Sequence, residues 1–79
     1  MGQKEKLLNK ARSSAANFRF NDLIKLAELC GFKKTRQKGS HVIMRHKTYD
    51  LFMNFQDHNG DAKPYQVGQL LQDIDDYNL

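Results

Sequence analysis

The sequence predicts an α+β fold, a two-layer sandwich with helix–strand–strand–strand–helix order and a three-stranded antiparallel sheet. Apolar residues recur at helical spacing in residues 21–30 and again after residue 64, whereas the segment between them alternates at strand spacing. Short turns separate the alternating stretches, so neighbouring strands should pair as an antiparallel meander. Because each helix has a single apolar stripe, both should cover the same face of the sheet and leave the other face open.

Length and composition limit the class of protein. The 79 residues allow one small domain without a deep pocket, and the net charge of +4 with a pI of about 9.4 favours a polyanionic partner. The single cysteine, Cys30, excludes an internal disulfide, so a reducing cytoplasm is the expected location. No apolar run approaches the length of a signal-peptide core or a membrane span, so no membrane partner is expected.

The charges are divided between two parts of the chain. Residues 48–79 contain six Asp and one Lys, whereas residues 31–47 contain no acid. The six cations of that central segment are Lys33, Lys34, Arg36, Lys38, Arg45 and Lys47. The central segment is therefore the predicted polyanion-binding face. The simpler alternative is that a lysine-rich strand is a solvated edge that resists aggregation.

The N-terminal part, residues 1–19, is interpreted as an extension that precedes a domain over residues 20–79. Its apolar residues are spaced loosely along one helical face and are Leu7, Leu8, Ala11, Ala15 and Phe18. This thin stripe predicts a short helix or a partly ordered arm.

The first helix of the domain is expected to begin at Asn21 as its N-cap, with Asp22 in the first turn where the helix dipole favours negative charge. Gly31 should end it as a left-handed residue. Its buried stripe should comprise Leu23, Leu26, Ala27 and Cys30, with Ile24 beside it. Cys30 is thus interpreted as a small core residue.

Three strands are predicted over residues 32–37, 40–46 and 49–55, with a tight turn at Lys38-Gly39. Alternation in the second strand divides its side chains between the two faces of the sheet. One face should carry His41, Ile43 and Arg45, and the other Val42, Met44 and His46. In the third strand, Leu51, Met53 and Phe55 should point opposite to Phe52 and Asn54.

Residues 56–61 are predicted to form a polar loop, after which Pro64 opens the last helix at its first position. The inner stripe of that helix should be Val67, Leu70, Leu71, Ile74 and Tyr77. Gly68 is unfavourable inside a helix, and close packing against the sheet would explain it. The acids near the helix C-terminus, Asp73, Asp75 and Asp76, oppose the helix dipole, and the sequence offers no folding reason for them.

His41 is the candidate catalytic residue, because an imidazole can take or give a proton near neutral pH. Positive charge, backbone N–H groups and a hydroxyl beside it would suit a phosphate. The residues expected to contact RNA are Arg36, Lys38, Gly39, Ser40 and Arg45. A strand histidine that is structural or merely exposed is the plainer alternative. No paired metal-ligand spacing occurs, so neither a metal nor another cofactor is expected.

The chain resembles the HicA toxin family over residues 21–79. The resemblance rests on Arg36-Gln37-Lys38-Gly39-Ser40-His41 with Arg45-His46 behind it, and on Lys63-Pro64-Tyr65-Gln66-Val67. It implies a fold similar to double-stranded-RNA-binding domains, metal-independent cleavage of mRNA with His41 as the catalytic residue, and a HicB-like antitoxin that masks the site. Many members have a second histidine where this chain has Val42. The rival functions are a non-catalytic RNA-binding module and a pure protein-interaction domain.

Overall fold

The computed structural model describes residues 2–79 and has an α+β fold, as the sequence predicts. Four antiparallel strands form one sheet in the order β1-β2-β3-β4. The elements are α1 (Gln3–Ser13), the 3₁₀ turn η1 (Ala15–Asn17), α2 (Phe20–Leu29), β1 (Phe32–Lys38), β2 (His41–His46), β3 (Phe52–His58), β4 (Asp61–Ala62) and α3 (Pro64–Tyr77).

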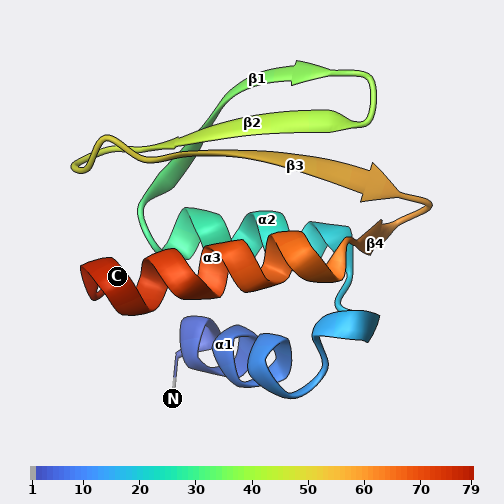
Figure 1. The fold of residues 1–79 in the computed structure, drawn as a ribbon, viewed down its shortest axis with the longest axis horizontal. Helices are drawn as coiled ribbons and strands as arrows, with labels where there is room; N and C mark the ends of the chain where they lie inside the picture. The colour runs from blue at the N-terminus through green and yellow to red at the C-terminus, as the bar shows by residue number, and fades with distance from the viewer. Residues whose placement is uncertain (1) are drawn as a thin grey trace.

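The elements are stacked in layers (Figure 1). The sheet lies above α2 and α3, which run side by side beneath one of its faces, and the other face is open. Helix α1 lies beneath α2 and α3, on the side away from the sheet. The two expected layers, the sheet and the pair of helices α2 and α3, are therefore present. The packed helix α1 adds a third layer.

Helix α1 is held by both apolar and polar contacts. Leu7 and Ala11 are buried, and Phe18, which follows the helix, is fully buried. Arg12 donates to both carboxylate oxygens of Asp75 on α3, at 2.8 and 3.3 Å. The hydrogen bond from Arg12 lowers the pKa of the Asp75 carboxyl below its usual 3.8. One of the acids that the sequence left unexplained thus pairs with α1.

The core lies where the inner face of the sheet meets α2 and α3. Its largest fully buried side chains are Phe18, Phe55, Leu23, Leu26, Met44, Leu70 and Val67. The predicted burial of Leu23, Ala27, Leu70 and Ile74 is confirmed, as is that of Cys30. The predictions for Leu71 and Tyr77 are wrong, since Leu71 is only partly buried at the margin of the core and Tyr77 is exposed.

The start of α2 differs from the prediction. The helix begins at Phe20, with Arg19 in the N-cap position and no side-chain cap, so Asn21 lies inside the first turn. The N–H of the buried Phe20 donates to the carbonyl of Gly60 at 2.9 Å. This tertiary contact satisfies one of the terminal N–H groups that have no partner within the helix. The predicted end is confirmed, because Gly31 has a φ of +103°.

Two turns differ from the prediction. The β1–β2 turn is Gly39-Ser40, with Gly39 at φ +59°, so Lys38 is the last residue of β1 and pairs with His41. Strand β3 begins at Phe52 and continues to His58, and residues 56–58 are strand where a loop was expected. Asn59 and Gly60 both have positive φ, the pattern of a type I′ hairpin turn, and lead into β4.

Helix α3 begins at Pro64 as predicted, but the explanation offered for Gly68 is wrong. Gly68 is exposed, and a Cβ added to it would meet no atom within 4 Å. Nothing in the structure explains this glycine. Between residues 2 and 79, no helix has the length and apolar character that crossing a membrane would require.

Candidate nucleic-acid interface

The open face of the sheet carries three rows of side chains that run across β1, β2 and β3. Residues directly opposite one another in an antiparallel pair project from the same face, so the strand register defines the rows. The rows are Lys38–His41–Gln56, Arg36–Ile43–Asn54 and Lys33–Arg45–Phe52. They contain four cations and no carboxylate, which makes this face strongly basic.

A β-bulge at Thr35 places two of these cations beside His41. Phe32 and Lys34 of β1 lie opposite residues of the inner face, and strict alternation would turn Arg36 to that face as well. The register instead shifts between Lys34 and Arg36, and the hydroxyl of Thr35 donates to the carbonyl of Ile43 at 3.2 Å. The bulge therefore returns Arg36, and with it the following Lys38, to the open face.

His41 is exposed on this face, and its ring is within hydrogen-bond distance of Asn54 of β3. Its Nδ1 lies 3.2 Å from the Asn54 Oδ1. When the amide oxygen accepts a hydrogen bond from Nδ1–H, the other ring nitrogen, Nε2, is free for a substrate. Sequence reasoning missed Asn54, although it had placed this residue on one face of its strand.

Gln66 of α3 holds the backbone of β3 behind Asn54. It is buried; its Oε1 accepts from the N–H of Gln56 at 2.9 Å, and its Nε2 donates to the carbonyl of Asn54 at 3.0 Å. The Gln66 side chain thus bonds the backbone groups of β3 that lie beyond the short pairing with β4. Gln66 falls four residues before Leu70 and eight before Ile74, so its place on the apolar stripe was a signal of burial.

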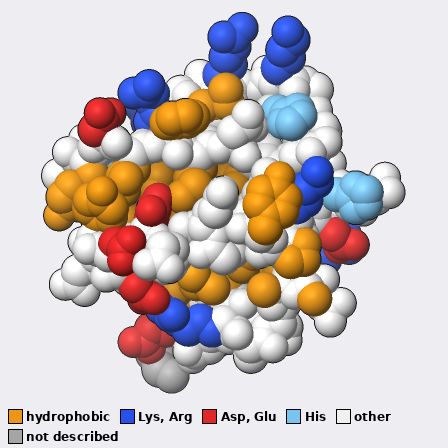
Figure 2. Space-filling view, viewed as in Figure 1, with side chains coloured by type: hydrophobic (Ala, Val, Ile, Leu, Met, Phe, Trp, Pro, Cys, Tyr) orange, Lys and Arg blue, Asp and Glu red, His pale blue; other side chains and the backbone are white. Residues whose placement is uncertain are grey.

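A shallow depression on the open face collects most of the predicted site. It is lined by Arg36, Lys38, Gly39, Ser40, His41, Ile43 and Asn54. Arg45 lies outside it, in the neighbouring row, where its guanidinium carbon is 5.9 Å from the centre of the Phe52 ring. In Figure 2, basic side chains project from the sheet at the top of the view, whereas acidic side chains gather over the helices at the lower left.

The other two histidines lie elsewhere. His46, on the inner face as predicted, donates from Nε2 to the carbonyl of Cys30 at 2.9 Å, and its Nδ1 accepts from the N–H of Thr48 at 3.0 Å. With both nitrogens occupied by backbone groups, His46 has a structural role. His58, at the end of β3, lines a separate depression with Lys63, Pro64 and Tyr65.

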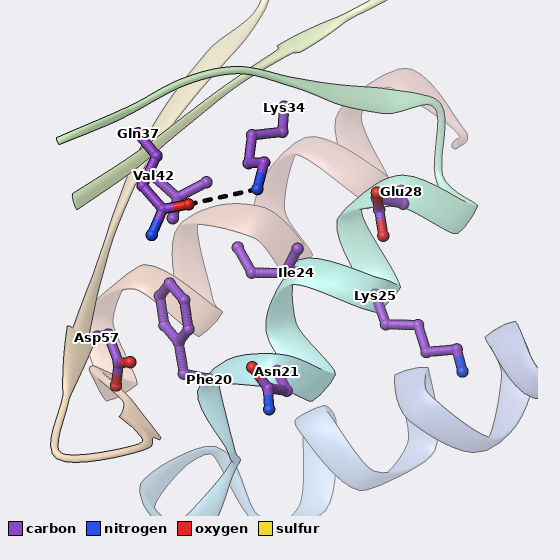
Figure 3. Close-up of a pocket in the computed structure, with 9 residues that line it drawn as sticks. All are labelled: Phe20, Asn21, Ile24, Lys25, Glu28, Lys34, Gln37, Val42 and Asp57. Atoms are coloured by element: carbon purple, nitrogen blue, oxygen red, sulfur yellow. Dashed lines mark hydrogen bonds between the residues drawn. The ribbon is translucent and has the colours of Figure 1, made fainter. Parts of the chain in front are cut away.

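A second groove lies between α2 and β1, beneath the inner face of the β1–β2 hairpin (Figure 3). Lys34 and Gln37 enter it from β1, with the Lys34 Nζ 3.3 Å from the Gln37 Oε1. The residues that line it include two cations, Lys25 and Lys34, and two acids, Glu28 and Asp57, so the groove has little net charge. No predicted site residue lines it, and the open face is therefore the better candidate for a polyanion.

No cluster of three His, Cys, Asp or Glu side chains that could hold a metal ion occurs within residues 2–79. The site that the described residues do build is a basic sheet face that carries the exposed His41. These features define a small α+β protein whose open face suits a polyanion such as RNA.

The family follows from comparison with known proteins. The family model described as the HicA toxin of bacterial toxin–antitoxin matches residues 20–75. The chain therefore belongs to the HicA toxin family, whose members are known as mRNA-cleaving toxins. No curated protein and no solved structure matches it.

Proposed function

We propose that this protein is a toxin that cleaves mRNA in the cytoplasm without a metal ion, with His41 as the residue that transfers protons. Membership of the HicA family supports the reaction class. The observation that carries the proposal is the position of His41, which is exposed on a basic face beside Arg36 and Lys38 and hydrogen-bonded through Nδ1 to Asn54.

The chemistry needs one exchangeable proton site and positive charge. The Nε2 of His41 takes the proton of a ribose 2′-hydroxyl, and the 2′-oxygen then attacks the adjacent phosphorus. The bond from phosphorus to the 5′-oxygen breaks, and the His41 Nε2–H returns its proton to this oxygen as it leaves. The products are a 2′,3′-cyclic phosphate and a free 5′-hydroxyl.

The neighbours of His41 have distinct parts in this proposal. Arg36 and Lys38 stabilise the negative charge that grows on the phosphate oxygens, and Gly39 and Ser40 offer backbone N–H groups and a hydroxyl. Asn54 accepts from Nδ1–H both when the ring is neutral and when it is charged. The ring can thus keep one orientation through the whole cycle.

A HicB-like antitoxin is the proposed protein partner, as membership in a toxin–antitoxin family suggests. An antitoxin that inhibits by masking would cover the open face. Its contact surface should place acidic groups against Arg36, Lys38 and Arg45, which carry no acidic neighbour in the three rows.

The test compares the wild type with His41→Ala on one RNA, in the presence of a chelator. His41→Ala should lose cleavage by a factor of about 10²–10⁴ and keep the wild-type circular dichroism spectrum, because the side chain is exposed. His58→Ala, which removes another exposed histidine outside the depression, should cleave normally. RNA with deoxyribose at the scissile position should resist the wild type.

Equal cleavage by a well-folded His41→Ala protein would refute the catalytic assignment.

The second candidate function, a non-catalytic RNA-binding module, has one observation in its favour. Among the described residues that line the depression, His41 is the only histidine, and no carboxylate lies beside it to serve as a second acid or base. Salt-sensitive RNA binding without cleavage by the wild type would establish that function. Absence of RNA binding at moderate salt would instead favour a pure protein-interaction domain.

A further inference from the structure

Phe52 occupies an unusual position, since it stands on the open face among cations. It is 62% exposed, more than any other large apolar side chain in residues 2–79. Its row contains Lys33 and Arg45. No step of the proposed cleavage uses the Phe52 ring.

The fold does not need this ring. The neighbouring residues of β3, Met53 and Phe55, point to the inner face and are buried, so they supply the apolar contacts that hold the strand. The ring of Phe52 meets the guanidinium of Arg45 at 5.9 Å and otherwise remains largely accessible. A polar residue at this position would serve a solvated sheet face as well.

We propose that Phe52, with Arg45 and Lys33, forms a stacking subsite for one base of single-stranded RNA that flanks the cleavage position. The inference rests on the proposed function of His41. An aromatic ring on a basic face provides both contacts that unpaired nucleic acid uses, because the base stacks on the ring and its phosphates meet the cations.

The register sets the distance between this subsite and the scissile phosphate. His41 and Arg45 are four residues apart on β2, so their rows are separated by about 13 Å at roughly 3.3 Å per residue. Stacked nucleotides advance about 3.4 Å each, and extended ones advance further. An RNA strand lying along β2 therefore spans the two rows in about four nucleotides or fewer.

The subsite gives the enzyme a preference for unpaired RNA. Ile43, which is partly buried in the middle row, provides an apolar floor between Phe52 and His41. A base in a duplex keeps both faces stacked on its neighbours and cannot lie on the ring. The subsite should therefore select single strands and fix which phosphate reaches His41.

A protein partner is the competing occupant of Phe52. The centres of protein interfaces are depleted in charged residues, whereas Phe52 has a cation on each of the two strands that complete its row. The three rows also lack any carboxylate, which matches the uniform negative charge of an RNA strand. The charge pattern thus favours RNA as the occupant.

The test measures binding in full-length protein that carries His41→Ala, so that the RNA stays intact. The probe is a short fluorescently labelled RNA rich in adenine, offered as a single strand and as a duplex. Adding Phe52→Leu should raise the Kd for the single strand by about tenfold, since one stacked base is worth roughly 1–3 kcal/mol. Phe52→Tyr should retain binding.

Matched controls separate stacking from charge and from general effects. Tyr77→Leu removes an exposed ring from α3 and should leave the Kd unchanged. Phe52→Leu should leave the salt dependence of binding unchanged because it removes no charge, whereas Arg45→Gln should flatten its slope by about one unit. Duplex binding should be insensitive to Phe52→Leu.

In the active protein, Phe52→Leu should raise KM for single-stranded RNA and broaden the set of cleaved positions. In the binding test, a Kd of the Phe52→Leu variant for the single strand within twofold of that of the His41→Ala parent would overturn the subsite. An equal loss of duplex binding would overturn it as well. Loss of antitoxin binding with unchanged RNA binding would assign the ring to a protein interface and also overturn it. If RNA binds through Phe52 but the wild type cleaves nothing, the catalytic assignment fails and the subsite stands.

Discussion

The two faces of the sheet show how one set of strands serves stability and binding separately. On β2, Val42 and Met44 point inward and are buried, whereas His41 and Arg45 point outward and are exposed. The two histidines at the ends of this strand follow the same division. His46 has both ring nitrogens bonded to backbone groups, and His41 has one nitrogen bonded to Asn54. Substitutions on the inner face should change stability, and those on the open face should change RNA binding and cleavage.

The largest expected effect on stability lies at the junction of α3 with the sheet. Leu70→Ala should lower the free energy of unfolding by about 2–5 kcal/mol, since Leu70 is fully buried and its removal leaves a cavity. A domain of this size has only about 5–15 kcal/mol in total. Leu71→Ala, one residue along and partly buried, should cost clearly less in the same urea titration. Equal losses for the two leucines would contradict this description of the core.

The next effect sharpens the role of Asn54. Asn54→Asp places a carboxylate beside the ring of His41 and favours its charged form, so the pH–rate profile for cleavage should move to higher pH. Asn54→Ala should lower kcat while leaving the profile in place, because the ring loses its orientation and gains no charge. Thermal melts of both variants should match the wild type, since Asn54 is exposed. An unmoved profile in Asn54→Asp would remove Asn54 from the mechanism.

Two lysines of β1 provide a matched pair across the sheet. Lys38 lies opposite His41 on the open face, and Lys34 lies opposite Met44 on the inner face, where it enters the groove beside α2. Lys38→Gln should weaken RNA binding and flatten its salt dependence by about one unit of slope. Lys34→Gln should change neither quantity in the same fluorescence titration, although it removes the same charge. Equal effects would mean that RNA responds to net charge and that the face is unimportant.

The strand order and the burial pattern were predictable from the sequence because they follow from local periodicity. Alternation assigned His41 and Val42 to opposite faces, and helical spacing found Leu70 and Ile74. The same rules missed β4, although Asn59-Gly60 is a strong hairpin signal, because the polar residues around this turn resembled a loop.

The candidate site was less accessible to sequence reasoning because its geometry depends on contacts between distant residues. The bulge at Thr35 decides whether Arg36 and Lys38 face His41, and no local pattern announces it. The contact of Asn54 with His41 depends on strand register, which Gln66 helps to fix from a separate helix. The start of α2 depends in the same way on a hydrogen bond from Phe20 to Gly60.

The smallest expected effect concerns two aspartates of α3, whose pKa values move in opposite directions. The hydrogen bond from Arg12 lowers the pKa of Asp75, whereas burial and then the charge of Asp76 raise the pKa of Asp73. The ionised form of Asp75 therefore stabilises the folded state above its unfolded pKa near 3.8, and this contribution disappears as the pH falls through the lower folded value. For Asp73 the sign is reversed, since its ionised form is disfavoured in the folded protein above the raised folded pKa.

Thermal melts at neutral and acidic pH test both signs with one pair of variants. At neutral pH, Arg12→Ala should lower the Tm slightly, because exposed ion pairs contribute little, and Asp73→Asn should raise it. At a pH below both the folded and the unfolded pKa of a carboxyl, that carboxyl is protonated in both states. Both Tm differences from the wild type should therefore shrink toward zero as the pH falls into this range. A Tm difference for Arg12→Ala that stays constant across this range would show that the arginine holds α1 by packing its aliphatic stem, and that its charge contributes nothing.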